Sequence, residues 1–157
     1  MNAFDSFASA HARTSAPSWQ DRLPLPLRAD AAGLTWERFT AIHAPQNGPV
    51  RLGGWSATAL GAGRSSYEAT LAVHASIHTA SAVANGPVAG MTALLHDLGI
   101  HLEILSFDQR ELGGAHATFL LCREGDRQMW AMGMGETAAE STLRAMIAGA
   151  NRLSVGR

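Results

Sequence analysis

The sequence predicts an α+β fold of two β-β-β-α units related by a pseudo-twofold axis, preceded by an N-terminal arm with one short helix. Two observations predict it. Residues 50 to 99 have the pattern of three strands and a helix, and residues 101 to 153 repeat that order. A shift of 52 positions then superposes similar residues, at helix caps as well as in helix cores. A fixed period of this length is typical of a duplicated unit.

The matched positions support a shared core. Each unit offers one apolar sheet face and a single helix to cover it, so the two units bury more surface together than apart. A homodimer would extend that burial. The pairs at this shift are Leu52 with Ile104, Trp55 with Phe107, Tyr67 with Phe119, Ala69 with Leu121, Ile77 with Met129, Asn85 with Thr137, Met91 with Leu143, Leu94 with Met146 and Leu95 with Ile147.

The chain divides into three parts. Residues 1–18 are rich in Ala, Ser and Thr without a period, and we expect a mobile tail. Residues 19–49 form a linker arm, in which prolines favour an extended run near Leu23 to Leu27. Thr35 can cap a short helix over 35–43, and breaker residues from 44 to 49 end it. Residues 50–157 form the main domain, with repeat 1 at 50–99 and repeat 2 at 101–153.

In repeat 1, the strands are expected at 50–60, 66–74 and 76–83, the first broken by Gly53 and Gly54. The helix that follows should end near Leu98, with Gly99 after it. The turn before it has the sequence Asn85-Gly86-Pro87. Asn85 is a good N-cap, Gly86 permits a close approach and Pro87 suits the first turn. Free N–H groups at such a helix start can hold a carboxylate. A capped turn that binds no ligand has the same sequence pattern.

In repeat 2, we expect strands at 101–107, 115–123 and 128–134, with a loop over 108–114 and a hairpin turn at Gly125-Asp126. Thr137 and Glu140 have the spacing of a capping box. They precede a last helix whose apolar face carries Leu143, Met146, Ile147 and Ala150.

Composition excludes several classes of function. Twelve Lys and Arg against 13 Asp and Glu give a formal charge of −1, which provides no basic field for nucleic acid. No apolar run is long enough to span a membrane, and the first 20 residues lack the pattern of a secretory signal. Cys122 is the single cysteine, which fits the reducing cytoplasm and a buried core position.

No known catalytic or metal-binding motif is present. The seven histidines form no His-x-His or His-Glu-x-x-His pattern, and no dinucleotide fingerprint or nucleophile elbow occurs. We therefore expect no catalytic residue, no metal and no cofactor. The four tryptophans, Trp19, Trp36, Trp55 and Trp130, are expected to be packing anchors.

Two stretches together resemble a known family. Asn85-Gly86-Pro87 is followed by a helix, Gly99 and then Leu102-Glu103-Ile104-Leu105. The closing stretch runs from Trp130-Ala131-Met132-Gly133-Met134-Gly135 to Ala150-Asn151-Arg152. Both are similar to the C-terminal regulatory domain of α-isopropylmalate synthase, and 34–45 is similar to the helix that precedes that domain. This enzyme makes the first committed precursor of leucine, and leucine inhibits it through this domain.

The resemblance implies a dimeric, duplicated domain that binds leucine between its units and takes part in allosteric regulation. It implies a lining of Asn85, Gly86, Pro87, Val88, Ala89, Ile104, Phe107, Ala115, Thr137 and Ala138. The apolar members would form a slot beside the carboxylate-binding helix starts. The implied partners are leucine or a related branched-chain acid, a second copy of the chain and a separate synthase subunit.

Departures from the family leave three hypotheses. The catalytic barrel has no counterpart, Ala84 replaces a glycine, and Ser106-Phe107-Asp108-Gln109-Arg110 stands where the family often has Asp-Tyr-x-Glu-His. The first hypothesis is a stand-alone, non-catalytic sensor. The second is a structural or interaction module with a vestigial pocket that docks a separate partner. The third, an enzyme acting alone, rests on kinship only.

Overall fold

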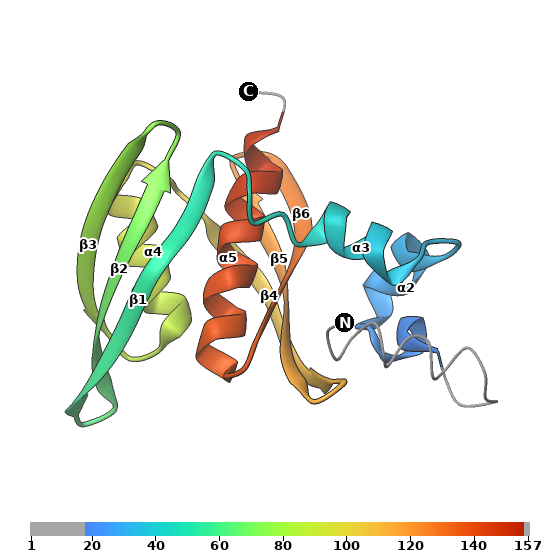
Figure 1. The fold of residues 1–157 in the computed structure, drawn as a ribbon, viewed down its shortest axis with the longest axis horizontal. Coiled ribbons are helices and arrows are strands. Elements are labelled where there is room, and N and C mark those ends of the chain that lie inside the picture. Colours follow the sequence, from blue (N-terminus) through green and yellow to red (C-terminus); the bar gives the residue numbers. More distant parts are fainter. Residues whose placement is uncertain (1–17, 156–157) are drawn as a thin grey trace.

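The computed structural model describes residues 18–155, and the predicted mobile tail lies almost entirely outside this range. Two three-stranded antiparallel sheets are present, each followed by a helix, which confirms the duplicated β-β-β-α fold (Figure 1). The first unit comprises β1 (Val50–Gly61), β2 (Arg64–Val73), β3 (Ser76–Ala84) and α4 (Pro87–Asp97). The second comprises β4 (Glu103–Leu112), β5 (Ala115–Glu124), β6 (Arg127–Gly135) and α5 (Ala138–Ser154).

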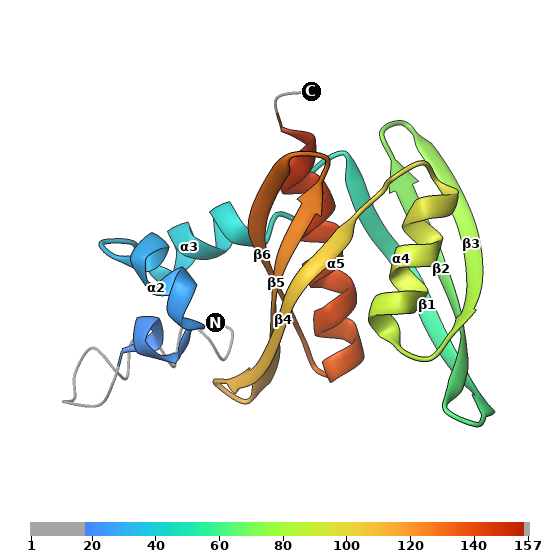
Figure 2. The ribbon, with the colours of Figure 1, turned by 180° about the vertical axis from the view of Figure 1, so that it is seen from behind.

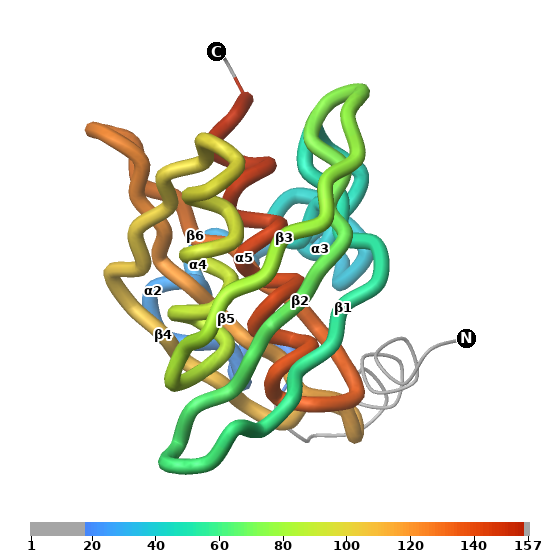
Figure 3. Tube along the Cα trace, turned by 90° about the vertical axis from the view of Figure 1, so that its left-hand side faces the viewer, coloured from blue at the N-terminus to red at the C-terminus, as the bar shows by residue number. Residues whose placement is uncertain are grey.

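The elements form layers. From left to right in Figure 1 these are the first sheet, the pair α4 and α5, the second sheet, and the arm; Figure 3 looks onto the first sheet from its outer side. One apolar core joins the inner faces of both sheets to both helices. Its largest fully buried members include Leu71, Met91, Leu94, Leu95, Leu120 and Met146. Each unit therefore buries its helix against the other unit as well as against its own sheet.

The arm covers the outer face of the second sheet. It contains η1 (Trp19–Arg22), α2 (Leu25–Ala31) and α3 (Trp36–His43). A second apolar cluster joins it to that face, with Trp19, Leu23, Leu27, Ala31, Trp36 and Phe39 from the arm and Leu112, Ala117, Phe119 and Met132 from the sheet. The outer face of the first sheet has no such cover among the described residues.

The prediction of an arm with one short helix is wrong in one respect. The predicted helix over 35–43 is present as α3, and the Thr35 hydroxyl accepts from the backbone N–H of Arg38 at 3.1 Å. The stretch predicted to be extended contains α2 instead. Pro24 is its N-cap and Pro26 lies in its first turn, where a missing N–H costs nothing. The two prolines thus begin a helix rather than prevent one.

Two predicted interruptions are also wrong. Gly53 and Gly54 do not break β1, because an extra residue between Leu52 and Trp55 is absorbed as a β-bulge. The predicted loop over 108–114 is mostly strand, since β4 continues to Leu112. The hairpin is closed by Gly113 and Gly114 alone, with φ of 59° and 84°. Positive φ at both positions matches the twist of the flanking strands, and glycine adopts it without strain.

The register of the duplication differs from the predicted shift after the first hairpin. The shift of 52 holds between β1 and β4, where Leu52 corresponds to Ile104. Their partners on the next strands, Leu71 and Cys122, are related by a shift of 51. Beyond them the shift is 51, because β1 has a second irregularity before Gly61 that β4 lacks. A slip of one residue moves side chains to the opposite face. Tyr67 therefore corresponds to Thr118 on the inner face, whereas Phe119 faces the arm.

The inner faces show why this register matters. A Cβ on Gly90 would lie 2.6 Å from the Tyr67 ring, so the ring packs directly on α4. At the corresponding positions of the second unit, Thr118 and Ser141 share a hydroxyl–hydroxyl hydrogen bond of 2.6 Å. The first unit thus packs the Tyr67 ring on Gly90, and the second unit has a hydrogen bond between Thr118 and Ser141 at the same place.

Candidate functional site

The two main helices begin at the same end of the molecule. In Figures 1 and 2, α4 and α5 both start at the lower end and run upward side by side, and their residues are in contact. The N-cap residues are Gly86 and Thr137, not Asn85 as predicted. Asn85 is exposed and no side chain caps α4. The two helix starts therefore present their positive dipole ends in the same direction.

Both first turns have unused donors. Among the described residues, no acceptor bonds the backbone N–H groups of Val88 and Ala89 or those of Ala138 and Ala139. The Thr137 hydroxyl accepts only from the backbone N–H of Glu140, at 3.1 Å. The predicted capping box is half formed, because the Glu140 carboxylate accepts from Glu136 rather than from Thr137. Such a pair of turns can hold a carboxylate.

The predicted lining does not gather in one place. Val88 is half-buried and packs on the central core beside its turn. Ile104 also packs on that core, but it pairs with Cys122, which contacts Gly149, far along α5 from its start. Phe107 is 49% exposed on β4. Ala115 lies on the arm side of the second sheet. The turns with Pro87 and Ala138 thus form the compact part of the predicted set.

Gln109 is a residue near the α5 start that the sequence did not single out. Its Nε2 lies 3.0 Å from the carbonyl oxygen of Ala138, 2.8 Å from the hydroxyl of Thr118 and 3.2 Å from that of Ser141. Thr142 Oγ1 is also within 3.3 Å. The correct register would have indicated this cluster, because it aligns Thr118 and Ser141 with Tyr67 and Gly90.

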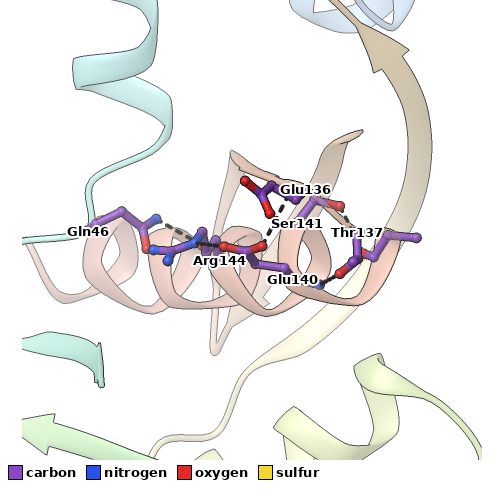
Figure 4. Close-up of polar contacts among 7 residues, drawn as sticks. Gln46, Glu136, Thr137, Glu140, Ser141 and Arg144 are labelled. Carbon is purple, nitrogen blue, oxygen red and sulfur yellow. Dashed lines mark hydrogen bonds and ion pairs between the residues drawn. The ribbon is translucent and has the colours of Figure 1, made fainter. Parts of the chain in front are cut away.

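A sizeable cavity lies elsewhere. It has a volume of about 630 Å³ and opens between the arm and the second unit. We call it the arm cavity. Its lining is Trp36, Thr40, Ala44, Gln46, Ala115, Met132, Gly133, Met134, Gly135, Glu136, Glu140 and Arg144. Figure 4 shows the polar side chains of Gln46, Glu136, Glu140 and Arg144 along the outer side of α5.

Two titratable side chains away from these sites, Cys122 and His43, are buried. Cys122 is fully buried, and burial raises the pKa of its thiol to about 12, so it is not a nucleophile. His43 is buried on α3, stacked on Phe39 with centroids 4.2 Å apart. Burial lowers its pKa below the ordinary value, and its Nδ1 lies 3.1 Å from the Phe39 carbonyl oxygen. Residues 18–155 contain no group of three His, Cys, Asp or Glu side chains that could hold a metal.

Comparison with known proteins identifies the relatives of the chain. No family model matches it. It is 28% identical over 134 residues to 2-isopropylmalate synthase from Renibacterium salmoninarum, and 27% identical over 131 residues to that of a Parafrankia species. In both cases the match covers 78% of this chain and 23% of the relative. The chain is similar to one part of 2-isopropylmalate synthase. The synthase from an Arthrobacter species is 26% identical over 127 residues, 74% of this chain and 22% of the relative.

These matches confirm the resemblance that the two sequence motifs indicated. The chain spans less than a quarter of the length of these synthases. The similarity supports a regulatory domain of the kind found in these synthases. It does not extend over their whole length. None of the helices between residues 18 and 155 is long and apolar enough to cross a membrane.

Proposed function

We propose that this relative of 2-isopropylmalate synthase is a non-catalytic regulatory domain, linked to leucine biosynthesis, that binds leucine or a similar small branched-chain acid. The observation that carries the proposal is the pair of helix starts with unused N–H groups at the same end of the molecule. Two such turns supply more donors to a carboxylate than one, and their dipoles act together. The proposed partner of the domain is a synthase subunit in the cytoplasm.

The proposed site consists of Asn85 to Ala89 and the turn at Thr137 and Ala138. The carboxylate of the ligand would accept from backbone N–H groups of both turns. Val88 would contact the aliphatic side chain, because it is the half-buried apolar residue of the α4 turn. Gln109 would hold the α5 turn in place through its bond to the Ala138 carbonyl oxygen. Phe107 would support the apolar side from β4, whereas Ile104 and Ala115 would lie away from the ligand.

The test is calorimetry of the full chain with leucine, isoleucine, valine and 2-ketoisovalerate. The decisive variant is Ala138→Pro, which deletes one N–H at the first position of α5. Pro87 already occupies that position in α4, so the fold should tolerate the change. Because a hydrogen bond to a charged group contributes about 1.5–3 kcal/mol, leucine should bind at least about tenfold more weakly. Retained thermal stability shows that the variant is folded.

Val155→Ala is the matched control, since Val155 is exposed and lies at the opposite end of α5 from the proposed site. It should bind leucine as the parent chain does, and Val88→Ala should bind more weakly. If none of the four ligands produces heat at millimolar concentration, the sensor proposal is wrong and the domain is an interaction module. Equal affinities of the parent chain and the Ala138→Pro variant would place the ligand elsewhere.

We also propose that the chain forms a homodimer through the outer face of the first sheet. Ile77 and Val83 alternate along the edge strand β3 on that face, 75% and 49% exposed. The corresponding face of the second sheet is covered by the arm. An uncovered edge with apolar side chains readily pairs with another chain. Sedimentation should give twice the chain mass, and Ile77→Glu should give a folded monomer; a monomeric parent chain would contradict this.

A further inference from the structure

The arm cavity has an apolar wall. Trp36 and Ala44 contribute from the arm, and Met132, Met134 and Ala115 from the second sheet. With about 630 Å³, it falls within the range of small-molecule sites, which are mostly apolar with a few polar groups. It lies on the arm side of the second sheet, whereas the α4 turn of the proposed leucine site lies on the opposite side of that sheet. The cavity adjoins the α5 turn of that site, because Glu136 and Glu140 flank Thr137 and Ala138, but neither Thr137 nor Ala138 lines it.

The opposite wall is acidic. Its charged residues are Glu136, Glu140 and Arg144, so two carboxylates against one guanidinium leave a formal charge of −1. Glu140 uses both its oxygens, because Oε1 accepts from Arg144 Nε and Oε2 accepts from the backbone N–H of Glu136, each at 3.1 Å. Within residues 18–155, no group bonds the carboxylate of Glu136. This carboxylate is the free charge of the cavity.

Further acceptors face the same space. Gln46 donates its Nε2 to the carbonyl oxygen of Arg144 at 3.0 Å, which leaves its Oε1 free to accept. Thr40 donates its hydroxyl to the Glu37 carbonyl oxygen, so that its lone pairs remain available. Both residues line the cavity from the arm side, and Figure 4 shows Gln46 reaching toward Arg144. A ligand that donates hydrogen bonds and carries positive charge matches this wall.

From this complementarity we propose that the arm cavity binds a small molecule with a primary ammonium group and an apolar body. The ammonium donates to Glu136 and Gln46, and the apolar body lies against Met134 and Trp36. The ligand contacts α3, β6 and α5 together, so it stabilises the docking of the arm on the second unit. The source can be a simple amine or an amino acid, whose carboxylate would accept from the free Nη groups of Arg144.

The test is NMR of the full chain with ¹³C-methyl methionine, titrated with 2-phenylethylamine. Met132 and Met134 line the cavity, whereas Met91 and Met146 are buried in the central core. The amine should shift the Met134 and Met132 signals and leave those of Met91 and Met146 in place. The neutral isostere 2-phenylethanol should bind more weakly, by up to about fivefold, and Glu136→Gln should weaken amine binding by a similar factor, because an exposed ion pair contributes up to about 1 kcal/mol. Glu68→Gln, an exposed carboxylate on the first sheet, is the control that should change nothing.

Titration with phenylalanine distinguishes the two sources. If phenylalanine binds more tightly than the amine, and the Arg144→Gln variant loses this difference, the natural ligand is an amino acid. If phenylalanine binds more weakly than the amine, the natural ligand is a simple amine. The proposal is overturned if the amine leaves Met132 and Met134 unshifted at millimolar concentration, if the alcohol binds equally well, or if Glu136→Gln binds the amine as tightly as the parent chain. None of these results depends on leucine binding at the helix starts, so either proposal can fail alone.

Discussion

Replacing Gly133 with alanine is expected to destabilise the chain by more than about 3 kcal/mol, at the upper limit for overpacked cores. A Cβ at this position would lie 2.0 Å from the backbone nitrogen of Ala145 and 2.5 Å from the backbone oxygen of Ser141. Backbone atoms of a helix cannot rotate away as the end of a side chain can. The only relief is to move α5 off β6, which opens the most extensive helix–sheet contact of the fold. Urea denaturation followed by circular dichroism measures the loss.

Gly54→Ala is the matched control for this substitution. Gly54 also lies in a strand, but a Cβ there would meet nothing within 4 Å. We expect its free energy of unfolding to stay within about 1 kcal/mol of the parent chain, as for ordinary surface changes. If Gly133→Ala were as stable as Gly54→Ala, α5 would not pack on β6 as closely as the structure has it.

Replacing Asn151 with alanine should cost about 3 kcal/mol, because it leaves several buried backbone groups without partners. Its Oδ1 accepts from the backbone N–H of Val50 at 2.8 Å, and its Nδ2 donates to the carbonyl oxygens of Val50 and Pro45, each at 2.9 Å. Asn151 is 2% exposed, so water does not replace these bonds. The side chain thus fixes the entry of β1 to the far part of α5. Thermal and urea unfolding give the magnitude.

Asn47→Ala tests whether the effect belongs to the contacts or to the residue type. Asn47 lies in the same connection but is exposed, and we expect a change within about 0.5 kcal/mol. Hydrogen exchange should also distinguish the variants, since the amide of Val50 should exchange faster in Asn151→Ala alone. Equal stability of the two variants would mean that the connection is not held by α5.

The sequence predicts the fold class because its strongest local signals agree with the tertiary structure. Alternation in the strands, the caps at Thr35 and Thr137 and the glycine after α4 all act within a few residues. The misplaced elements have weak or ambiguous local signals. The end of β4 carries Asp108, Gln109 and Arg110, and a polar run of this kind predicts a loop. In the structure these residues are strand, because they pair with β5.

The site was less predictable than the fold because it depends on register and long-range packing. A shift of 52 aligned Tyr67 with Phe119, and only the additional irregularity before Gly61 reveals that these side chains lie on opposite faces. With the wrong shift, the polar cluster around Gln109 could not be predicted, because Thr118 was not assigned to the inner face. The arm cavity could not be predicted from periodicity, since it exists only because α3 docks beside β6 across some 90 residues of sequence.

The one-sided position of the arm makes the two halves of the molecule unequal, although their elements follow the same order. If two copies join through the bare sheet, their arms must end up at opposite extremities of the assembly. Anything fused or bound to one arm would then be kept out of reach of its counterpart on the other. Communication between two such attachments would have to pass through both duplicated cores, not across a direct contact.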